Sequence, residues 1–181
     1  MKNIIIGVTG SIAAYKAAEL AHIFYKKGFE VEVIMTESAT KFITPLTFRS
    51  LTKNNVYTEM FRDDFPKDIK HISLAQKADV VLIAPATANI IGKLAGGIGD
   101  DMLSTTMLAV RNKPVLIAPA MNTNMWENPI VQDNIAKLKR YGYRFIEPKE
   151  SLLACGVTGK GALADIEDIV EAVDVAMDNK E

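Results

Sequence analysis

The chain has 181 residues, of which 49% are hydrophobic and 24% charged, and its formal net charge is -1. This length suffices for one domain with its own core, and a balanced charge without a basic run excludes an electrostatic surface for nucleic acid or anionic membranes. No apolar stretch approaches the roughly 20 residues that cross a bilayer, and the single cysteine, Cys155, excludes an internal disulfide. We therefore expect a cytoplasmic protein in a reducing compartment.

Short apolar runs alternate with helical patterns along the chain. The runs predict buried strands at residues 4–8, 31–35, 80–84, 115–118 and 143–146. Apolar residues at helical spacing predict helices over about 12–27, from Pro45 onward, from Pro129 to Gly142, and over about 165–177. This alternation predicts one α/β domain over residues 1–181, a three-layer, doubly wound, mostly parallel sheet of the Rossmann or flavodoxin-like class.

The first predicted helix is amphipathic. Ile12, Leu20 and Phe24 are expected to face the core, and Lys16 and His22 to lie on a polar, solvated stripe. Two longer stretches, 54–70 and 148–164, fit neither a strand nor a helix. Irregular segments of this length inside a domain are often functional.

The first strand runs into the loop Gly7-Val8-Thr9-Gly10-Ser11. Its glycines permit a tight turn, so the N–H groups of Gly10, Ser11 and Ile12 would face an anion at the start of the next helix, where the helix dipole favours negative charge. The alternative is a plain strand–helix turn with Ser11 as N-cap. The pattern is neither a dinucleotide fingerprint nor a P-loop.

The end of the second strand reads Thr36-Glu37-Ser38-Ala39-Thr40, with three hydroxyls around one acid. A dinucleotide fold usually places an acidic residue there for a ribose. Hydroxyls donate to a phosphate, whereas Glu37 would repel one unless it points away. The segment therefore favours a mononucleotide such as FMN over NAD.

The third and fourth strands end in Pro85-Ala86-Thr87-Ala88-Asn89 and in a run from Pro119 to Trp126. Small residues at this edge allow a flat ring to approach, and hydroxyl and amide groups could bond its heteroatoms. Asn122 in the second run could bind a ligand or stabilise a turn through its side chain. Both alternatives remain open from the residues alone.

The runs GVTGSIAAYK, PATAN, PAMNTNMW and LACGVTGKGAL, with KHISL around His71, occur in this order at matching strand ends. In this combination the chain closely resembles the flavin-dependent cysteine decarboxylases over nearly its whole length, and best those that act on phosphopantothenoylcysteine in coenzyme A biosynthesis. The resemblance implies an FMN-dependent carboxy-lyase without a metal, which converts 4′-phosphopantothenoylcysteine to 4′-phosphopantetheine. The rivals are an oxidative peptidyl-cysteine decarboxylase, a prenyl-flavin synthase, a non-enzymatic FMN-binding regulatory subunit and a simple electron-transfer flavoprotein.

The resemblance also implies roles for single residues. His71 would be the acid/base near the thiol and flavin, Asn122 would hold the substrate carboxylate, and Cys155 would protonate the enethiolate product, with Leu153 and Ala154 as further substrate contacts. His22 keeps its interpretation as a surface residue. The implied FMN-binding residues are Gly10, Ser11, Ile12, Thr36, Ser38, Thr87, Ala88, Asn89, Ala120 and Met121.

Relatives of this kind imply a homotrimer, or a tetramer of trimers, with active sites at subunit contacts. Because the chain ends at Glu181, a phosphopantothenoylcysteine synthetase is expected as a separate partner, and the glycine-bearing segment 148–164 is expected to be a mobile substrate loop. Two positions depart from the pattern. Ala162 stands where many bacterial members carry arginine, which would alter contacts to the substrate phosphate, and Asp101 stands where many carry asparagine, which would alter the subunit or flavin environment.

Overall fold

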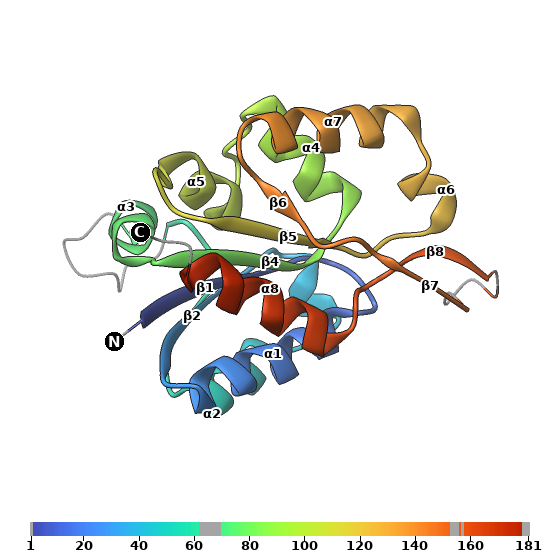
Figure 1. Cartoon of the computed structure of the whole chain (residues 1–181). Helices are drawn as coiled ribbons and strands as arrows, with labels where there is room; N and C mark the ends of the chain where they lie inside the picture. The colour runs from blue at the N-terminus through green and yellow to red at the C-terminus, as the bar shows by residue number, and fades with distance from the viewer. Residues whose placement is uncertain (1, 62–69, 153–155, 157, 179–181) are drawn as a thin grey trace.

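Six parallel strands form the central sheet, in the order β3-β2-β1-β4-β5-β6. The computed structural model in Figure 1 describes residues 2–61, 70–152, 156 and 158–178. The strands of this sheet are β1 (Lys2–Val8), β2 (Phe29–Met35), β3 (Val56–Tyr57), β4 (Val80–Ala86), β5 (Val115–Pro119) and β6 (Arg144–Phe145). The central strands are apolar and buried on both faces, as parallel strands covered by helices must be.

Helices cover both faces of the sheet, which gives the predicted three layers (Figure 1). One face packs on α1 (Ala14–Lys26), α2 (Pro45–Thr52) and α8 (Ile166–Asp178). The other packs on α3 (Lys70–Lys77), α4 (Ala88–Gly96), α5 (Met102–Ala109) and α7 (Pro129–Arg140). A 3-10 turn (Ala39–Lys41), the short α6 (Thr123–Trp126) and an antiparallel hairpin of β7 (Lys149–Leu152) and β8 (Thr158–Ala162) complete the described elements.

The predicted strands and helices are confirmed, with shifts of a few residues at their ends. Glycines follow the ends of α1 and α7: Gly28 and Gly142 have φ of 84° and 88°, which glycine adopts at low cost, and the predicted stop at Gly142 is confirmed. The inward positions predicted for α1 hold for Leu20 and Phe24, which are fully buried, but the prediction for Ile12 was wrong, since its side chain is 63% exposed.

The two unassigned stretches contain short strands. Segment 54–70 begins with β3, which has only two residues and lies at the sheet edge, too short for a periodic pattern. Segment 148–164 contains the hairpin β7–β8, which lies outside the main sheet and extends from the end of the molecule where α6 lies (Figure 1). In the described residues, none of the helices has the length and apolar character to cross a membrane.

The strand order reverses between β1 and β4, which are neighbours in the sheet. From β1 the chain crosses through α1 to β2 on one side, and from β4 it crosses to β5 on the other. In open parallel sheets, such a switch point opens a crevice at the carboxyl ends of the strands. The loops after β1 and β4 therefore mark where a ligand site is expected.

Candidate active site

Two adjoining cavities open at the carboxyl ends of β1, β4 and β5, and both are lined by Gly10, Thr87 and Met125. The first, here called the apolar cavity, measures about 460 Å³ and the second, the polar cavity, about 510 Å³. The apolar cavity is lined further by Ser11, Ile12, Ala13, Tyr15, Lys16, Ala120, Met121, Asn122, Leu152, Gly161, Ala162 and Leu163. The polar cavity is lined further by Thr9, Thr36, Glu37, Ser38, Asn89, Ile90, Lys93, Asp100 and Asp101.

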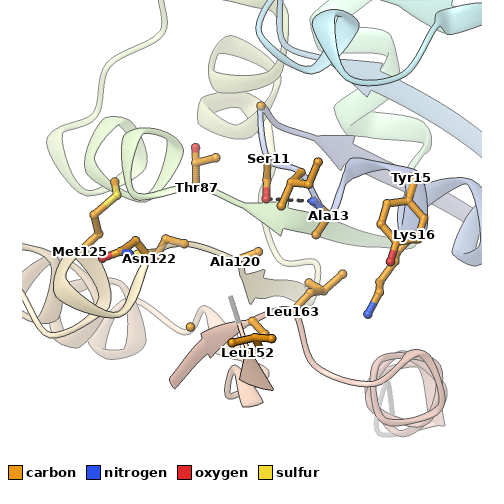
Figure 2. A pocket seen from close by; sticks show the side chains of 15 residues that line it. Ser11, Ala13, Tyr15, Lys16, Thr87, Ala120, Asn122, Met125, Leu152 and Leu163 are labelled. Atoms are coloured by element: carbon orange, nitrogen blue, oxygen red, sulfur yellow. Dashed lines mark hydrogen bonds between the residues drawn. The ribbon is translucent and has the colours of Figure 1, made fainter. Parts of the chain in front are cut away.

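The loop after β1 lies between the two cavities, but its amides are used differently from the prediction. The Ser11 amide donates to the carbonyl of Thr9 at 2.9 Å, so it is engaged within the turn. The Ser11 hydroxyl accepts from the Ala13 amide at 3.2 Å (Figure 2), one residue before α1 begins. A strand–helix turn is thus present, but the expectation that Ser11 is the N-cap was wrong, because the N-cap of α1 is Ala13 and has no side-chain capping bond. Gly10 and Ile12 still line the apolar cavity.

Position 10 has room only for glycine, because Ser38 packs against it. A Cβ at this position would overlap the Cβ of Ser38, because the loop after β1 packs directly on the turn after β2. Thr36 and Ser38 both line the polar cavity, as predicted, whereas the Thr40 hydroxyl donates to the Glu37 carbonyl at 2.7 Å and stabilises the turn. Glu37 lines the same cavity but is exposed, so solvent screens its charge.

Thr9 is a site residue that the sequence analysis missed. Its side chain is 1% exposed, and its hydroxyl donates to the Pro85 carbonyl at 2.7 Å and accepts from the Thr87 amide at 3.0 Å. The hydroxyl thereby joins the ends of β1 and β4, the two strands that flank the switch point. A small polar residue inside a glycine-rich loop offers no local signal for such a contact.

Replacing Thr9 with valine should lower the free energy of unfolding by about 1–3 kcal/mol, because the buried Pro85 carbonyl and Thr87 amide each lose a partner. Thr9→Ser keeps the hydroxyl and should retain most of the stability. Denaturant titration of both variants measures the difference. Equal stability of the valine and serine variants would show that the hydroxyl does not hold the two strand ends.

The ends of β4 and β5 supply the remaining predicted side chains. Thr87 is the N-cap of α4, and its hydroxyl accepts from the Ile90 amide at 3.4 Å; Asn89 lines the polar cavity. Ala88 begins α4 and lines neither cavity. Ala120 and Met121, directly after β5, line the apolar cavity.

Asn122 stabilises a turn, one of the two alternatives that its sequence left open. Its Oδ1 accepts from the Asn124 amide at 2.9 Å, which makes it the N-cap of α6. The residue also lines the apolar cavity, where Figure 2 shows it with Met125 on one side and Tyr15 and Lys16 on the other. Lys16, predicted on a solvated stripe, is half-buried and is the lysine that lines this cavity.

An ion-pair cluster closes the polar cavity. The Lys93 ammonium lies 2.6 Å from Asp100 Oδ1 and 2.7 Å from Asp101 Oδ2, and Asp101 also caps α5 by accepting from the Ser104 amide at 2.8 Å. Burial acts to raise the pKa of Asp101, but the hydrogen bonds from Lys93 and Ser104 outweigh it and lower the pKa overall. The departure at Asp101 thus provides an ion pair that a neutral asparagine would lack.

Because the folded-state pKa of Asp101 is depressed, its stabilising effect is present above the ordinary pKa of 3.8 and is lost as the pH falls through the lower folded-state value. Asp101→Asn keeps a capping acceptor but removes the ion pair, and should lower the free energy of unfolding at neutral pH by about 0.5–1 kcal/mol. In denaturant titrations the gap between variant and wild type should close as the pH drops below about 4. A gap of the same size at both pH values would exclude the ion pair as its cause.

The residues expected to perform the chemistry are not gathered in the described cavities. His71 is half-buried near the start of α3 and lines neither cavity. Figure 1 places α3 at the opposite end of the sheet from β7 and β8. Leu153, Ala154 and Cys155 lie outside the described residues. His22 is half-buried on α1, and its Nδ1 has no hydrogen-bond partner among the described residues.

The cleft fits a flavin phosphate and ring. Thr36 and Ser38 line the polar cavity together with Gly10, on which Ser38 packs, and hydroxyls beside a glycine loop at a helix start are a donor set suited to a phosphate. Beside it, the walls of the apolar cavity carry Ile12, Met121 and Leu163, which suit a flat, mainly apolar ring. Among the described residues, no group of three or more histidine, cysteine or acidic side chains could hold a metal ion.

Comparison of the sequence with known proteins supports this assignment. The family described as Flavoprotein matches residues 1–177. A probable phosphopantothenoylcysteine decarboxylase of Streptococcus mutans is 50% identical over 96% of this chain and 97% of its own length. The coenzyme A biosynthesis bifunctional protein CoaBC of Bacillus subtilis is 52% identical over 94% of this chain, but the match spans only 42% of that protein.

Solved structures agree with the sequence relatives. A PPC decarboxylase mutant complexed with pantothenoylaminoethenethiol has a TM-score of 0.88 at 33% identity and covers 96% of this chain and 97% of its own. The FMN-dependent cysteine decarboxylase SpaF has a TM-score of 0.86 at 32% identity, with 99% and 97% covered. The cofactor expected in the cleft is accordingly a flavin. The chain belongs to the flavoprotein family and, within it, to the flavin-containing cysteine decarboxylases.

Proposed function

We propose that the chain is an FMN-dependent carboxy-lyase that converts 4′-phosphopantothenoylcysteine to 4′-phosphopantetheine in coenzyme A biosynthesis. The proposal rests mainly on one observation. The glycine loop after β1, which is suited to a phosphate, and the side-chain amide of Asn122 line adjoining cavities of one cleft. Gly10 and Ser38 lie in contact on one side, and Asn122 lines the adjoining apolar cavity. The near full-length match to a probable phosphopantothenoylcysteine decarboxylase supports this reaction for the cleft.

FMN is the flavin that this cleft suits. Thr36, Ser38 and the loop from Gly10 would hold its phosphate monoester. When bound, FMN would supply a two-electron sink, so that the substrate CH2–SH could reach the thioaldehyde level and later regain the hydride. The carboxylate would then be β to a C=S group. This group can accept the electron pair that remains when the carboxylate leaves as carbon dioxide.

The side chains of this chain hold the substrate and move its protons. Asn122 offers a neutral amide to the carboxylate, which orients the group without stabilising the charge that must be lost. The apolar walls around it disfavour a carboxylate more than neutral carbon dioxide. His71 would exchange a proton with the substrate thiol, and Cys155 would protonate the enethiolate at carbon.

A neighbouring copy of the chain supplies His71 in this proposal. His71 lines neither cavity of its own chain, and α3 lies at the far end of the sheet from the hairpin that borders the apolar cavity (Figure 1). A homotrimer, or a tetramer of trimers, with the site at the subunit contact would bring the two together. A phosphopantothenoylcysteine synthetase is the expected partner, since the matched CoaBC relative is a bifunctional protein of coenzyme A biosynthesis.

Lys16 should bind the substrate phosphate, because among the described residues it is the cationic one that lines the apolar cavity, and it lies on the side away from Asn122 (Figure 2). Losing a charge-assisted contact costs roughly 1.5–3 kcal/mol, so Lys16→Gln should raise KM for phosphopantothenoylcysteine about ten- to hundredfold. KM for the unphosphorylated analogue pantothenoylcysteine should stay unchanged. A similar rise in KM for both substrates would remove Lys16 from phosphate recognition.

Cofactor binding and carbon dioxide release test the proposed function together. Purified protein should be yellow, or bind added FMN, and should release carbon dioxide from phosphopantothenoylcysteine in that state. Protein that takes up no FMN would contradict the proposal at its first step. FMN-loaded protein that leaves this substrate intact but decarboxylates a peptide with a C-terminal cysteine would favour the peptidyl-cysteine alternative.

A further inference from the structure

Strand β8 lies directly on the segment that carries Asn122. The Met121 amide donates to the Gly161 carbonyl at 2.9 Å, which ties the strand to the residue just before Asn122. Gly161, Ala162 and Leu152 form one wall of the apolar cavity, and Asn122 lines the same cavity. The position of the β7–β8 hairpin therefore determines the space between this wall and the Asn122 amide.

Two glycines of β8 make this close approach possible. A Cβ on Gly161 would overlap the Met121 carbonyl oxygen, which is a backbone atom and cannot turn aside, and the φ of 150° at Gly161 also disfavours a side chain. A Cβ on Gly159 would overlap the Oγ1 of Thr123 and lie 3.1 Å from its Cγ2. Both glycines thus present bare backbone to residues 121–123.

Lys160 lies between the two glycines, and its side chain contacts Glu147 and Trp126. Its ammonium lies 2.9 Å from Glu147 Oε2 and 5.5 Å from the ring centre of Trp126, which is 7% exposed at the end of α6. The ion pair is exposed and contributes little by itself. Lys160 nevertheless places β8 beside Glu147 and Trp126. A displaced β8 would therefore also move away from Trp126.

We propose that Gly159 and Gly161 are positioning residues that seat the hairpin on Met121–Thr123 and thereby set the substrate-binding geometry of Asn122. This inference rests on the proposed function for the identity of the substrate. An added Cβ at Gly161 pushes the hairpin off its seat and separates the cavity wall from the Asn122 amide. Gly10 and Ser38, where the flavin phosphate is expected, belong to other loops and would stay in place.

The main variant is Gly161→Ala, with Gly92→Ala as its matched control. Gly92 lies within α4, where a Cβ would meet only Asn134 Nδ2 at an ordinary 3.8 Å. We expect Gly161→Ala to raise KM for phosphopantothenoylcysteine roughly ten- to hundredfold, and to weaken FMN binding by a clearly smaller factor, because the flavin phosphate is expected at Gly10 and Ser38, away from the hairpin. Gly92→Ala should change neither. An unchanged KM, or a parallel loss of FMN affinity in Gly161→Ala, would overturn the inference.

A double-mutant cycle adds a readout that general destabilisation would not move. Gly159→Ala should raise KM by less than Gly161→Ala, because its Cβ meets a side chain and not backbone. Thr123→Ala removes the overlapping Oγ1 and Cγ2, so Gly159→Ala with Thr123→Ala should recover KM toward the Thr123→Ala value. Additive losses in the double variant would contradict the seating contact.

Fluorescence of the single tryptophan tests the seat independently of catalysis. In Gly161→Ala at the same flavin loading, the emission of Trp126 should shift to the red because β8 no longer covers the ring. If the wild type fails to decarboxylate but the shift occurs, the proposed function is wrong, whereas the contact of the hairpin with Met121–Thr123 is supported. If the wild type is active and Gly161→Ala keeps both the wild-type KM and the wild-type Trp126 emission, the positioning role of Gly161 is wrong, whereas the proposed function is supported.

Discussion

Asn122→Asp is expected to lower kcat/KM for phosphopantothenoylcysteine at least about 100-fold, a loss of about 2.7 kcal/mol in transition-state binding. The substitution replaces the neutral amide in the apolar cavity with a carboxylate that faces the carboxylate of the substrate. The fold should persist, because aspartate is as good an N-cap as asparagine and its oxygen can still accept from the Asn124 amide. Steady-state kinetics and a thermal unfolding curve measure both effects.

Asn128→Asp is the matched control. Asn128 caps α7 in the same way, since its Oδ1 accepts from the Ile130 amide at 2.9 Å, but it is exposed and lines neither cavity. The control should retain wild-type kinetics and stability. If Asn122→Asp loses activity only as much as Asn128→Asp does, the amide of Asn122 has no part in substrate binding.

His71→Asn is expected to lower kcat by about 10²–10⁴-fold, the range contributed by a positioned general acid or base. Binding of FMN should stay near wild type, because the contacts expected for the flavin phosphate are made by Gly10, Thr36 and Ser38 and not by His71. His22→Asn serves as the control with the same substitution on α1, and should keep full activity. Loss of FMN binding in His71→Asn would point to a structural role in place of proton transfer.

Mixing two inactive variants tests whether neighbouring copies share a site. If His71 acts in the cavity of the adjacent subunit, refolding Asn122→Asp with His71→Asn in equal amounts should restore about a quarter of wild-type activity, since random assembly gives that share of sites both native residues. A mixture no more active than the separate variants would place both residues in one chain's own site.

Most of the fold could be predicted from the sequence because its strands are buried on both faces. The apolar runs of β1, β2, β4 and β5 stand out against polar helix surfaces, and Gly28 and Gly142 mark helix ends. Helix α5 was missed because some of its hydroxyl residues are buried together with its apolar ones, so the sequence lacks a helical period. Helix α4 was missed because it begins at Ala88, within a run that was interpreted as a ligand-binding strand end.

The site could be predicted only where its residues follow strands directly. Gly10, Thr36, Thr87 and Asn122 were placed at the carboxyl edge because the strand ends were clear. Thr9 and Lys16 were not, since their roles depend on contacts with β4 and on the hairpin wall, which are far away in the sequence. The seating of Gly161 on Met121 is non-local in the same way.

The mass of the product tests the central claim most directly. FMN-loaded protein should convert phosphopantothenoylcysteine to a thiol that has lost only carbon dioxide, because the hydride removed from the substrate returns to it and the reaction has no net redox change. Mass spectrometry of the reaction mixture should therefore show 4′-phosphopantetheine. An unchanged substrate, or a product lighter by a further hydrogen molecule, as an oxidised enethiol would be, would contradict the proposed function.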